Sequence, residues 1–320
     1  MTETKKSFKS RLTDFVLANG ILFAIIILII ITGIIEPNFL AWSNLVNILR
    51  QVSVNGIVAC GMTVCIMSSC YDLSVGSIVS MTGVFTIMCI NNGMNEILCI
   101  LIGLGIGLVA GILNGTLIAV IDGRPGEAFL VTYGMEIVLA AIALFPSKGL
   151  FIAGRVYDGV FKSLGSGNTP IYIFLIVALI LHFFLSKTQY GRKLRYIGNN
   201  MDAAKMSGIR VKLNRISYFA ISGLLAGLGG LVLCSRVTSA NPTAGLNYEM
   251  NAIAAVVVGG NSASGGSGSI IRTVIGAIVI GIMGNALNIL GFSTNYQLIV
   301  KGFLIILAVA LDIISKNIKH

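Results

Sequence analysis

Charged residues are scarce in this sequence, and their scarcity excludes a soluble globular protein. Only 11% of the 320 residues are Asp, Glu, Lys or Arg, whereas 56% are hydrophobic and the mean hydropathy is +0.93. Soluble domains carry about 25% charged residues. A chain with so few charges could not cover a globule of this size with polar surface, so we expect an integral membrane protein.

Groups that serve catalysis and metal binding are also few. The two histidines are His182, within an apolar run, and His320, at the end of the chain, and they form no plausible site. The six cysteines lie in or at the ends of apolar runs without a CxxC pair, so we interpret them as small buried hydrophobic residues. The GxxxxGK[ST] phosphate loop is absent. We therefore predict no enzyme activity, no cofactor and no metal site in this chain.

Long hydrophobic runs are abundant, and they predict an all-α, polytopic transmembrane helix bundle that forms a single domain over residues 1–320. A helix needs about 20 residues to cross a hydrocarbon core of about 30 Å. Ten segments are candidate crossings: Phe15–Ile35, Val52–Ser69, Leu73–Ile90, Ile97–Val120, Phe129–Leu144, Ile171–Leu185, Ile216–Leu233, Met250–Val258, Ile270–Leu290 and Leu298–Ile314. Because Met250–Val258 is too short to cross alone, we expect a broken helix there or an extension by flanking small residues.

Lysine and arginine predict the orientation of these crossings. With ten crossings, both termini share a side with the long connection over residues 186–215, and 16 of the 22 basic residues gather on that side. The positive-inside rule makes it cytoplasmic, including the basic N-terminal residues 1–14. The net charge of +10 then reflects topology and lipid contact rather than nucleic-acid binding.

Asp72 and Ser74 are candidate residues of a translocation pathway, because they lie between two apolar runs. An ionisable group within a membrane costs about 2.5–3.5 kcal/mol on insertion scales and usually faces a cavity or a partner. The alternative is structural: Asp72 could cap the following helix at the membrane interface through the amide of Ser74 or Val75. The two interpretations are compatible.

Three further polar residues are candidates for the same pathway. Asn114 lies in the segment Gly111–Gly115, whose glycines favour close helix packing, so it could either line a pathway or hydrogen-bond to a neighbouring helix. Glu136 lies inside an apolar run and should face the bundle interior or a cavity. Glu249 precedes the short run Met250–Val258 and could be a pathway residue or a helix cap.

The connection over residues 186–215 contains a predicted short helix. Asp202–Ser207 is rich in good helix formers with an acidic residue in its first turn, and Gly208 suits the position that ends a helix. An exposed helix between two crossings on the cytoplasmic side could dock onto another protein. The alternative is a solvated loop without a partner.

Taken in order, these segments resemble the permease subunits of the ribose/xylose/galactose group of bacterial ABC importers. The resemblance rests on Asp72-Leu73-Ser74-Val75-Gly76-Ser77, Asn241-Pro242-Thr243-Ala244-Gly245, Ala252–Gly260 and Asp202-Ala203-Ala204-Lys205-Met206-Ser207-Gly208, the last of which is similar to the EAA-xxx-G signature with Asp for Glu. Three departures occur. Ser69-Cys70-Tyr71 replaces the usual paired glycines, Ala128–Gly134 loosens a Pro-Phe-Ile-Val-Thr-Leu-Gly pattern, and Asn251 stands where relatives often carry an acid.

The resemblance implies a transport subunit of the bacterial cytoplasmic membrane that moves a ribose-like monosaccharide or a related small polar solute. Its implied partners are an ATPase with two nucleotide-binding modules, an extracytoplasmic sugar-binding protein and a second permease copy, most simply an identical one. Asp202, Ala203, Ala204 and Gly208 would belong to the helix that couples to the ATPase. An ion-coupled secondary transporter is the main alternative, with Glu136 as its best support.

Overall fold

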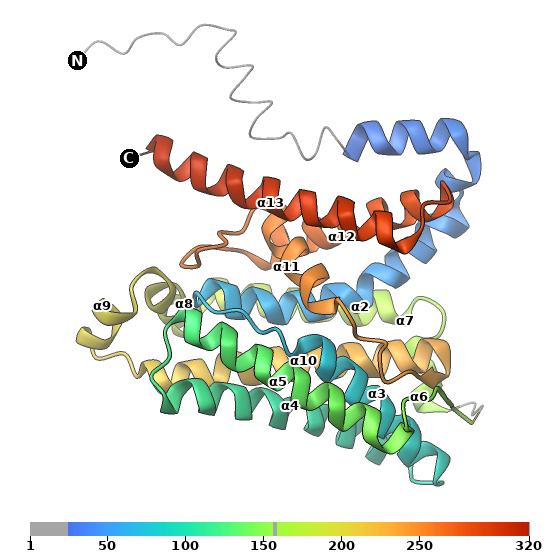
Figure 1. Ribbon diagram of the computed structural model, residues 1–320, viewed down its shortest axis with the longest axis horizontal. Helices are drawn as coiled ribbons and strands as arrows, with labels where there is room; N and C mark the ends of the chain where they lie inside the picture. The colour runs from blue at the N-terminus through green and yellow to red at the C-terminus, as the bar shows by residue number, and fades with distance from the viewer. Residues whose placement is uncertain (1–24, 156–158, 320) are drawn as a thin grey trace, which may run out of the picture.

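The computed structural model of the chain describes residues 25–155 and 159–319, with side chains up to residue 310, and these residues form a bundle of helices (Figure 1). In chain order the elements are an apolar helix over Ile25–Ile35, the 3-10 turn η1 (Pro37–Leu40), α2 (Trp42–Met67), α3 (Val75–Asn91), α4 (Glu96–Val120), α5 (Pro125–Ser147), β1 (Ile152–Ala153), α6 (Val160–Gly165), α7 (Thr169–Lys187), α8 (Gln189–Asn199), α9 (Met201–Met206), α10 (Val211–Val237), β2 (Ser239–Ala240), α11 (Tyr248–Val258), α12 (Ile270–Ile289) and α13 (Thr294–Lys319).

The predicted crossings coincide with these helices to within a few residues in most cases. Six helices are long and apolar enough to span a membrane, namely α2, α4, α5, α7, α10 and α12, and shorter apolar helices cover Ile25–Ile35, Val75–Asn91, Tyr248–Val258 and Thr294–Ala310. The basic N-terminus, residues 1–14, and the expected start of the first crossing at Phe15 lie outside the described residues.

α2 begins ten residues before the predicted start at Val52, because polar residues there do not interrupt the helix. They find partners on other helices instead. Asn44 donates to Asn285 Oδ1 at 2.9 Å, Arg50 donates to Asn168 Oδ1 at 3.1 Å, and Asn47 Oδ1 accepts from Arg236 at 3.1 Å. A hydropathy pattern cannot show that these side chains are satisfied by tertiary contacts, so it places the helix start too late.

α4 and α10 pack together along a seam of small residues. Gly103, Gly107, Gly111 and Gly115 follow one another at every fourth position of α4, and a Cβ added to Gly107 would meet the backbone of Gly223 and Gly227 on α10. Small residues at such an interface let helix backbones approach closely, which is how helices associate in lipid. The packing role expected for Gly111 and Gly115 is confirmed, since added Cβ atoms there would meet the α10 backbone.

The helices divide into enclosed and outward-facing ones. Most of α2 and much of α10 are buried, whereas α4, α5 and α7 expose large apolar side chains such as Leu101 (59% exposed) and Phe145 (88% exposed). Apolar side chains that point away from the core of a bundle match a lipid environment or a partner subunit. The described residues therefore have the surface expected of an all-α membrane protein.

The two ends of the bundle differ. α8 and α9 lie at the left end in Figure 1, the end toward which α13 also runs, while α6 and the strands lie at the right end. β1 and β2 pair antiparallel, with Ile152 opposite Ala240, so the connection over residues 145–170 contains both a strand and the helix α6. This connection is therefore more structured than a loop.

α11 is a short helix, and the chain changes direction after it. Its 11 residues span about 16 Å at 1.5 Å per residue, which is about half of a hydrocarbon core. The glycine- and serine-rich segment 259–269 then leads into α12, and α11 packs against α12 and α2. A Cβ added to Gly276 of α12 would meet the carbonyl of Ala255 on α11, so the two helices touch backbone to backbone.

Candidate coupling and translocation sites

The predicted helix over Asp202–Ser207 is present as α9, one residue displaced at Met201–Met206. Its first turn is capped by Asn200, whose Oδ1 accepts from the amide of Ala203 at 3.0 Å. Asn is among the best residues for this position, because its side chain satisfies an amide that the helix leaves unpaired. Asp202 stands in the first turn, where a negative charge complements the helix dipole.

Gly208 ends α9 in the left-handed conformation predicted for it, with φ = +79°. The amide of Gly208 donates to the carbonyl of Lys205 at 3.0 Å, and the amide of Ile209 donates to that of Ala204 at 3.1 Å. These two bonds form the Schellman motif, which closes a helix and favours glycine at this position. Open space surrounds Gly208, so a side chain there is disfavoured by backbone strain and not by crowding.

Of the four residues expected to couple to a partner, three face outward. Asp202, Ala203 and Gly208 are exposed, whereas Ala204 is buried at 3% exposure and attaches the helix to the bundle. Met206 projects furthest, with 89% of its surface exposed. α9 therefore projects from the bundle as a small helix, with Met206 as its large exposed apolar side chain. We call residues 201–208 the knob.

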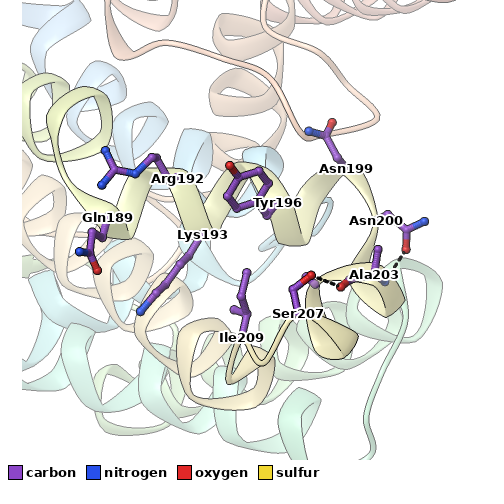
Figure 2. A pocket seen from close by; sticks show the side chains of 10 residues that line it. Gln189, Arg192, Lys193, Tyr196, Asn199, Asn200, Ala203, Ser207 and Ile209 are labelled. Atoms are coloured by element: carbon purple, nitrogen blue, oxygen red, sulfur yellow. Dashed lines mark hydrogen bonds between the residues drawn. The ribbon is translucent and has the colours of Figure 1, made fainter.

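A groove lies between α8 and α9 (Figure 2). It encloses about 560 Å³. Gln189, Arg192, Lys193 and Tyr196 line it from α8, and Asn200, Ala203, Ser207 and Ile209 line it from α9 and its flanks. In Figure 2, the basic side chains of α8 gather at one end of the groove, away from Asn200. The groove is thus polar and basic at one end, and it is large enough to receive side chains of a docking partner.

Lys205 ties α9 to the end of α4. Its Nζ lies 2.7 Å from Oδ2 of Asp122, which follows α4 directly, and both side chains are partly exposed. The hydrogen bond from Lys205 lowers the pKa of Asp122 below its ordinary value. An exposed pair of this kind contributes little stability, because water screens the attraction between the two charges. Its role is to orient the knob relative to the bundle.

The α8–α9 unit touches two breaks in the membrane helices. Ser69, which follows α2, donates through Oγ to the carbonyl of Gly198 on α8 at 2.6 Å and lies 2.8 Å from the carbonyl of Ser264 in the segment after α11. The amide of Gly266 donates to the carbonyl of Met67 at 3.0 Å. Three segments far apart in the sequence therefore meet at one point beneath α8.

Asp72 sits next to this junction and is fully buried. Its Oδ1 accepts from the amide of Ser74 at 3.2 Å and from Oγ of Ser74 at 2.7 Å, while its Oδ2 accepts from Oγ of Ser222 on α10 at 2.8 Å. Asn114 on α4 donates to Ser74 Oγ at 2.7 Å and approaches Asp72 Oδ1 at 3.4 Å. We call these four residues the Asp72 cluster.

The Asp72 cluster fastens the beginning of α3 to α4 and α10. The bond from the Ser74 amide to Asp72 lies just before α3, whose N-cap is Ser74 and which has no side-chain capping bond, so Asp72 does not cap the helix. The bonds of Asn114 are the contacts between helices considered for that residue. All four residues are 0% exposed, and none lines the described cavities of the chain. α4 and α10 enclose Asp72, so its carboxylate contacts protein and not solvent.

Glu249 and Glu136 lie on another side of α3. Glu249, at the first turn of α11, is 6% exposed, and a Cβ added to Gly76 would meet its Oε2 and the carbonyl of Gly245. Glu136 on α5 is partly buried, and its carbonyl accepts from Ser77 Oγ, one residue after Gly76, at 2.8 Å. The sequence candidates thus form two groups, the Asp72 cluster and this acidic pair, separated by the start of α3.

The motif Asn241–Gly245 has a clear local role. Oδ1 of Asn241 accepts from the amide of Thr243 at 3.0 Å and from its Oγ1 at 2.9 Å, which folds the segment into a tight turn. The amide of Gly245 then donates to Ser80 Oγ on α3 at 2.8 Å. A Cβ on Gly245 would collide with the carbonyl of Gly76, so both glycines permit the contact between this turn and α3.

Sequence reasoning missed a cavity lined by amide side chains. It encloses about 290 Å³ between α2, α11, α12 and α13. Its polar lining consists of Gln51, Asn55, Asn251, Asn285, Asn288, Thr294, Gln297 and Lys301. Gln51 and Asn55 are four residues apart on α2, and Asn285 and Asn288 are three apart on α12, so a search for amides repeating on one helix face would have found them.

The chain is similar to transport permeases along nearly its whole length. The family described as "Branched-chain amino acid transport system / permease component" matches residues 44–309. The ribose import permease protein of Bacillus subtilis strain 168 is 41% identical over 298 residues, covering 92% of this chain and 92% of that protein.

Two Escherichia coli K12 proteins give comparable matches. Its ribose import permease protein is 39% identical, covering 91% of this chain and 92% of that protein. Its D-allose transport system permease protein is 38% identical, covering 93% and 92%. No solved structure matches the chain.

Proposed function

The chain belongs to the permease family of the branched-chain amino acid transport type, and on that premise we propose that it moves a ribose-like monosaccharide as the transmembrane subunit of an ATP-driven importer. It is a multi-pass protein of the cytoplasmic membrane. The observation that carries the proposal is the match over nearly the whole chain to permeases named for ribose and allose. The family is described by amino acid transport, but these relatives are named for sugars.

Family membership implies an ATPase and a substrate-binding protein as partners. We further propose that the ATPase carries two nucleotide-binding modules and that two copies of this chain form the membrane part. Residues 1–320 would form one permease domain with both termini in the cytoplasm. α13 runs toward the same end of the bundle as α8 and α9 in Figure 1, which supports a common side for the C-terminus and the coupling loop.

The coupling step is assigned to α9. Nucleotide-driven closure of the ATPase moves the knob formed by Asp202, Ala203, Ala204 and Gly208, with Met206 as its exposed apolar contact. α8 carries the movement to the junction of Ser69, Gly198 and Gly266, where two membrane helices are broken. The permease has an outward-open and an inward-open state. ATP can shift the balance between these two states only if ATP binds more tightly to the ATPase conformation that pairs with one of them.

The translocation residues predicted from the sequence keep two roles in this proposal. The Asp72 cluster of Asp72, Ser74, Asn114 and Ser222 holds α3, α4 and α10 as one block beside the pathway. Glu136 and Glu249 flank the other side of α3, where a change in packing would expose their carboxyl groups to a passing solute. The ion-coupled alternative would instead assign this pair to a cation.

Right-side-out vesicles that contain the full complex distinguish these mechanisms. The vesicles are loaded with ATP or with ADP and are given the binding protein and labelled D-ribose. We expect uptake only with ATP. Uptake with ADP under an imposed proton or sodium gradient would contradict the proposal and support an ion-coupled transporter.

A variant pair tests the coupling helix. Ala203→Glu places a charge on the exposed knob without straining the backbone, and we expect ATPase activity to continue while uptake falls about tenfold or more, because contacts at an interface of this kind are worth about 1–2 kcal/mol or more. Asn92→Glu, on an exposed position at the opposite end of the bundle, is the matched control. Equal uptake in both variants would remove α9 from the coupling step.

A further inference from the structure

The amide-lined cavity is built from side chains that can both donate and accept hydrogen bonds. Asn55, Asn251, Asn288 and Gln297 come from four different helices and converge on one space, and Lys301 adds a cationic donor. Among the described residues that line it, none is acidic and none is aromatic. Primary amides match hydroxyl groups, because each amide carries two N–H donors and a carbonyl acceptor.

One amide in this cavity lacks a partner. Oδ1 of Asn55 is buried and accepts no hydrogen bond from the described residues. A buried acceptor without a donor costs about 1–3 kcal/mol, so such atoms usually serve a ligand or an ordered water. Asn285, in contrast, is already satisfied by exchange of hydrogen bonds with Asn44 at 2.9 and 3.1 Å, which fixes the wall of the cavity.

The place and size of the cavity suit a small solute that enters from outside. It lies where α12 ends and α13 begins, towards the end of the bundle opposite α9 (Figure 1). Its volume of about 290 Å³ is at the lower limit of the about 300–1,000 Å³ typical of small-molecule sites. A monosaccharide fits this volume better than a larger sugar.

We infer that this cavity binds an uncharged, monosaccharide-sized polyol by hydrogen bonds to Asn55, Asn251, Asn288 and Gln297, so that the permease itself selects its solute after release from the binding protein. The inference rests on the proposed import function and adds a site to it. A cavity that hydrogen-bonds hydroxyl groups rejects analogues that lack them, because its amides are then left unpaired. Lys301 disfavours cationic solutes in the same space.

A space-filling substitution tests whether the solute passes through this cavity. Gly284 lines it, and a Cβ added there has no neighbour within 4 Å, so the side chain of Gly284→Leu has room in the cavity. Gly134→Leu is the matched control, because Gly134 is an exposed helical glycine on α5 that also has no neighbour within 4 Å. Leucine is the better helix former at both positions.

We expect Gly284→Leu to lower ATP-dependent uptake of D-ribose by about tenfold or more at normal membrane abundance, because the leucine side chain occupies the space in which the solute would reach the amides. Gly134→Leu should transport like the parent protein. Equal uptake by the two variants would overturn the inference while leaving the import function intact.

A labelling experiment measures binding without transport. Asn55→Cys and Asn251→Cys are treated in the full complex with a hydrophilic methanethiosulfonate, and Asn92→Cys serves as the exposed control outside the cavity. The native background is low, because five of the six cysteines are buried. D-Ribose, D-allose, L-arabinose and the anion D-gluconate are compared as protecting solutes.

We expect at least one of the three neutral sugars to slow modification of both cavity cysteines and to leave Asn92→Cys unaffected. Protection by L-arabinose without import of D-ribose would support the cavity and refute the ribose assignment. The inference is overturned if none of the sugars protects either cysteine, or if D-gluconate protects better than all of them.

Discussion

The Asp72 cluster and the amide-lined cavity place polar side chains at membrane depth in opposite ways. In the cluster, Asp72 is 0% exposed and each of its carboxylate oxygens accepts a hydrogen bond from a protein hydroxyl. In the cavity, Oδ1 of Asn55 is buried without a partner among the described residues. An amide oxygen without a partner occurs in both regions, because Oδ1 of Asn114 in the cluster is also buried without one among the described residues. Asn55 differs in that it lines a cavity with room for a ligand, whereas Asn114 lines none of the described cavities.

This difference separates stability from function. A buried polar group is costly when its partners are missing, and it is neutral or favourable when they are present. Loss of Asp72 would leave Ser74 and Ser222 unpaired inside the bundle, whereas loss of Asn55 removes a group that the protein does not satisfy by itself. Variants of the Asp72 cluster should consequently lower the free energy of unfolding, whereas variants of the cavity should lower uptake of the solute.

The largest expected effect comes from Asp72→Leu. It removes the acceptor of several buried donors, each of which then costs about 1–3 kcal/mol, so the free energy of unfolding should fall by about 3 kcal/mol or more. Asn55→Leu, its counterpart in the cavity, should change the free energy of unfolding by less than about 1 kcal/mol, while uptake of the solute declines. Unfolding of the purified protein in detergent by a denaturing surfactant measures both.

Asp72→Asn is the conservative control, because the amide keeps the shape and one carbonyl acceptor for Ser74 or Ser222. It should lie between the parent protein and Asp72→Leu in stability. If Asn55→Leu destabilised the protein as much as Asp72→Leu, the distinction between the two regions would be lost.

The sequence predicts the helices of this fold better than its sites. Hydropathy predicts a crossing over Ile97–Val120, and α4 covers Glu96–Val120. The agreement is close because lipid requires a continuous apolar run. Hydropathy misplaces the start of α2, since the hydrogen bonds of Asn44 and Arg50 belong to tertiary structure. α9 is predicted well because its capping residue and its terminal glycine act locally.

The candidate site residues divide along the same line. Asp72 stands out because a charge between apolar runs is conspicuous in any sequence, but its burial depends on Ser222, 150 positions further along the chain. Asn55 and Asn251 are inconspicuous, and only the packing of α2 against α11 brings them to one cavity. Contacts between distant segments are what the sequence alone leaves open.

A smaller effect is expected from Ser222→Ala, which removes one hydrogen bond and keeps Asp72 in place. Hydrogen bonds between membrane helices are worth about 0.6 kcal/mol on average and up to about 1.7 kcal/mol, and a bond to a carboxylate should approach the upper value. The free energy of unfolding should fall by that amount. Ser186→Ala is the control, because Ser186 bonds only weakly to Phe183 within its own helix, at 3.5 Å. An unchanged stability for Ser222→Ala would indicate that the cluster does not fasten α10.

The smallest effect is expected outside both regions, at the exposed pair of Lys205 and Asp122. The bond from Lys205 holds the pKa of Asp122 below its ordinary value. A lowered folded pKa means that the contribution to stability is present above the unfolded pKa and is lost as the pH falls through the folded one. The free energy of unfolding of Asp122→Asn, measured as a function of pH, should therefore fall slightly less steeply at acid pH than that of the parent protein. At neutral pH the two free energies should be almost equal. A steep loss of stability in this variant at neutral pH would show that exposed polar contacts matter as much as buried ones, and the contrast between satisfied and available polar groups would then explain little.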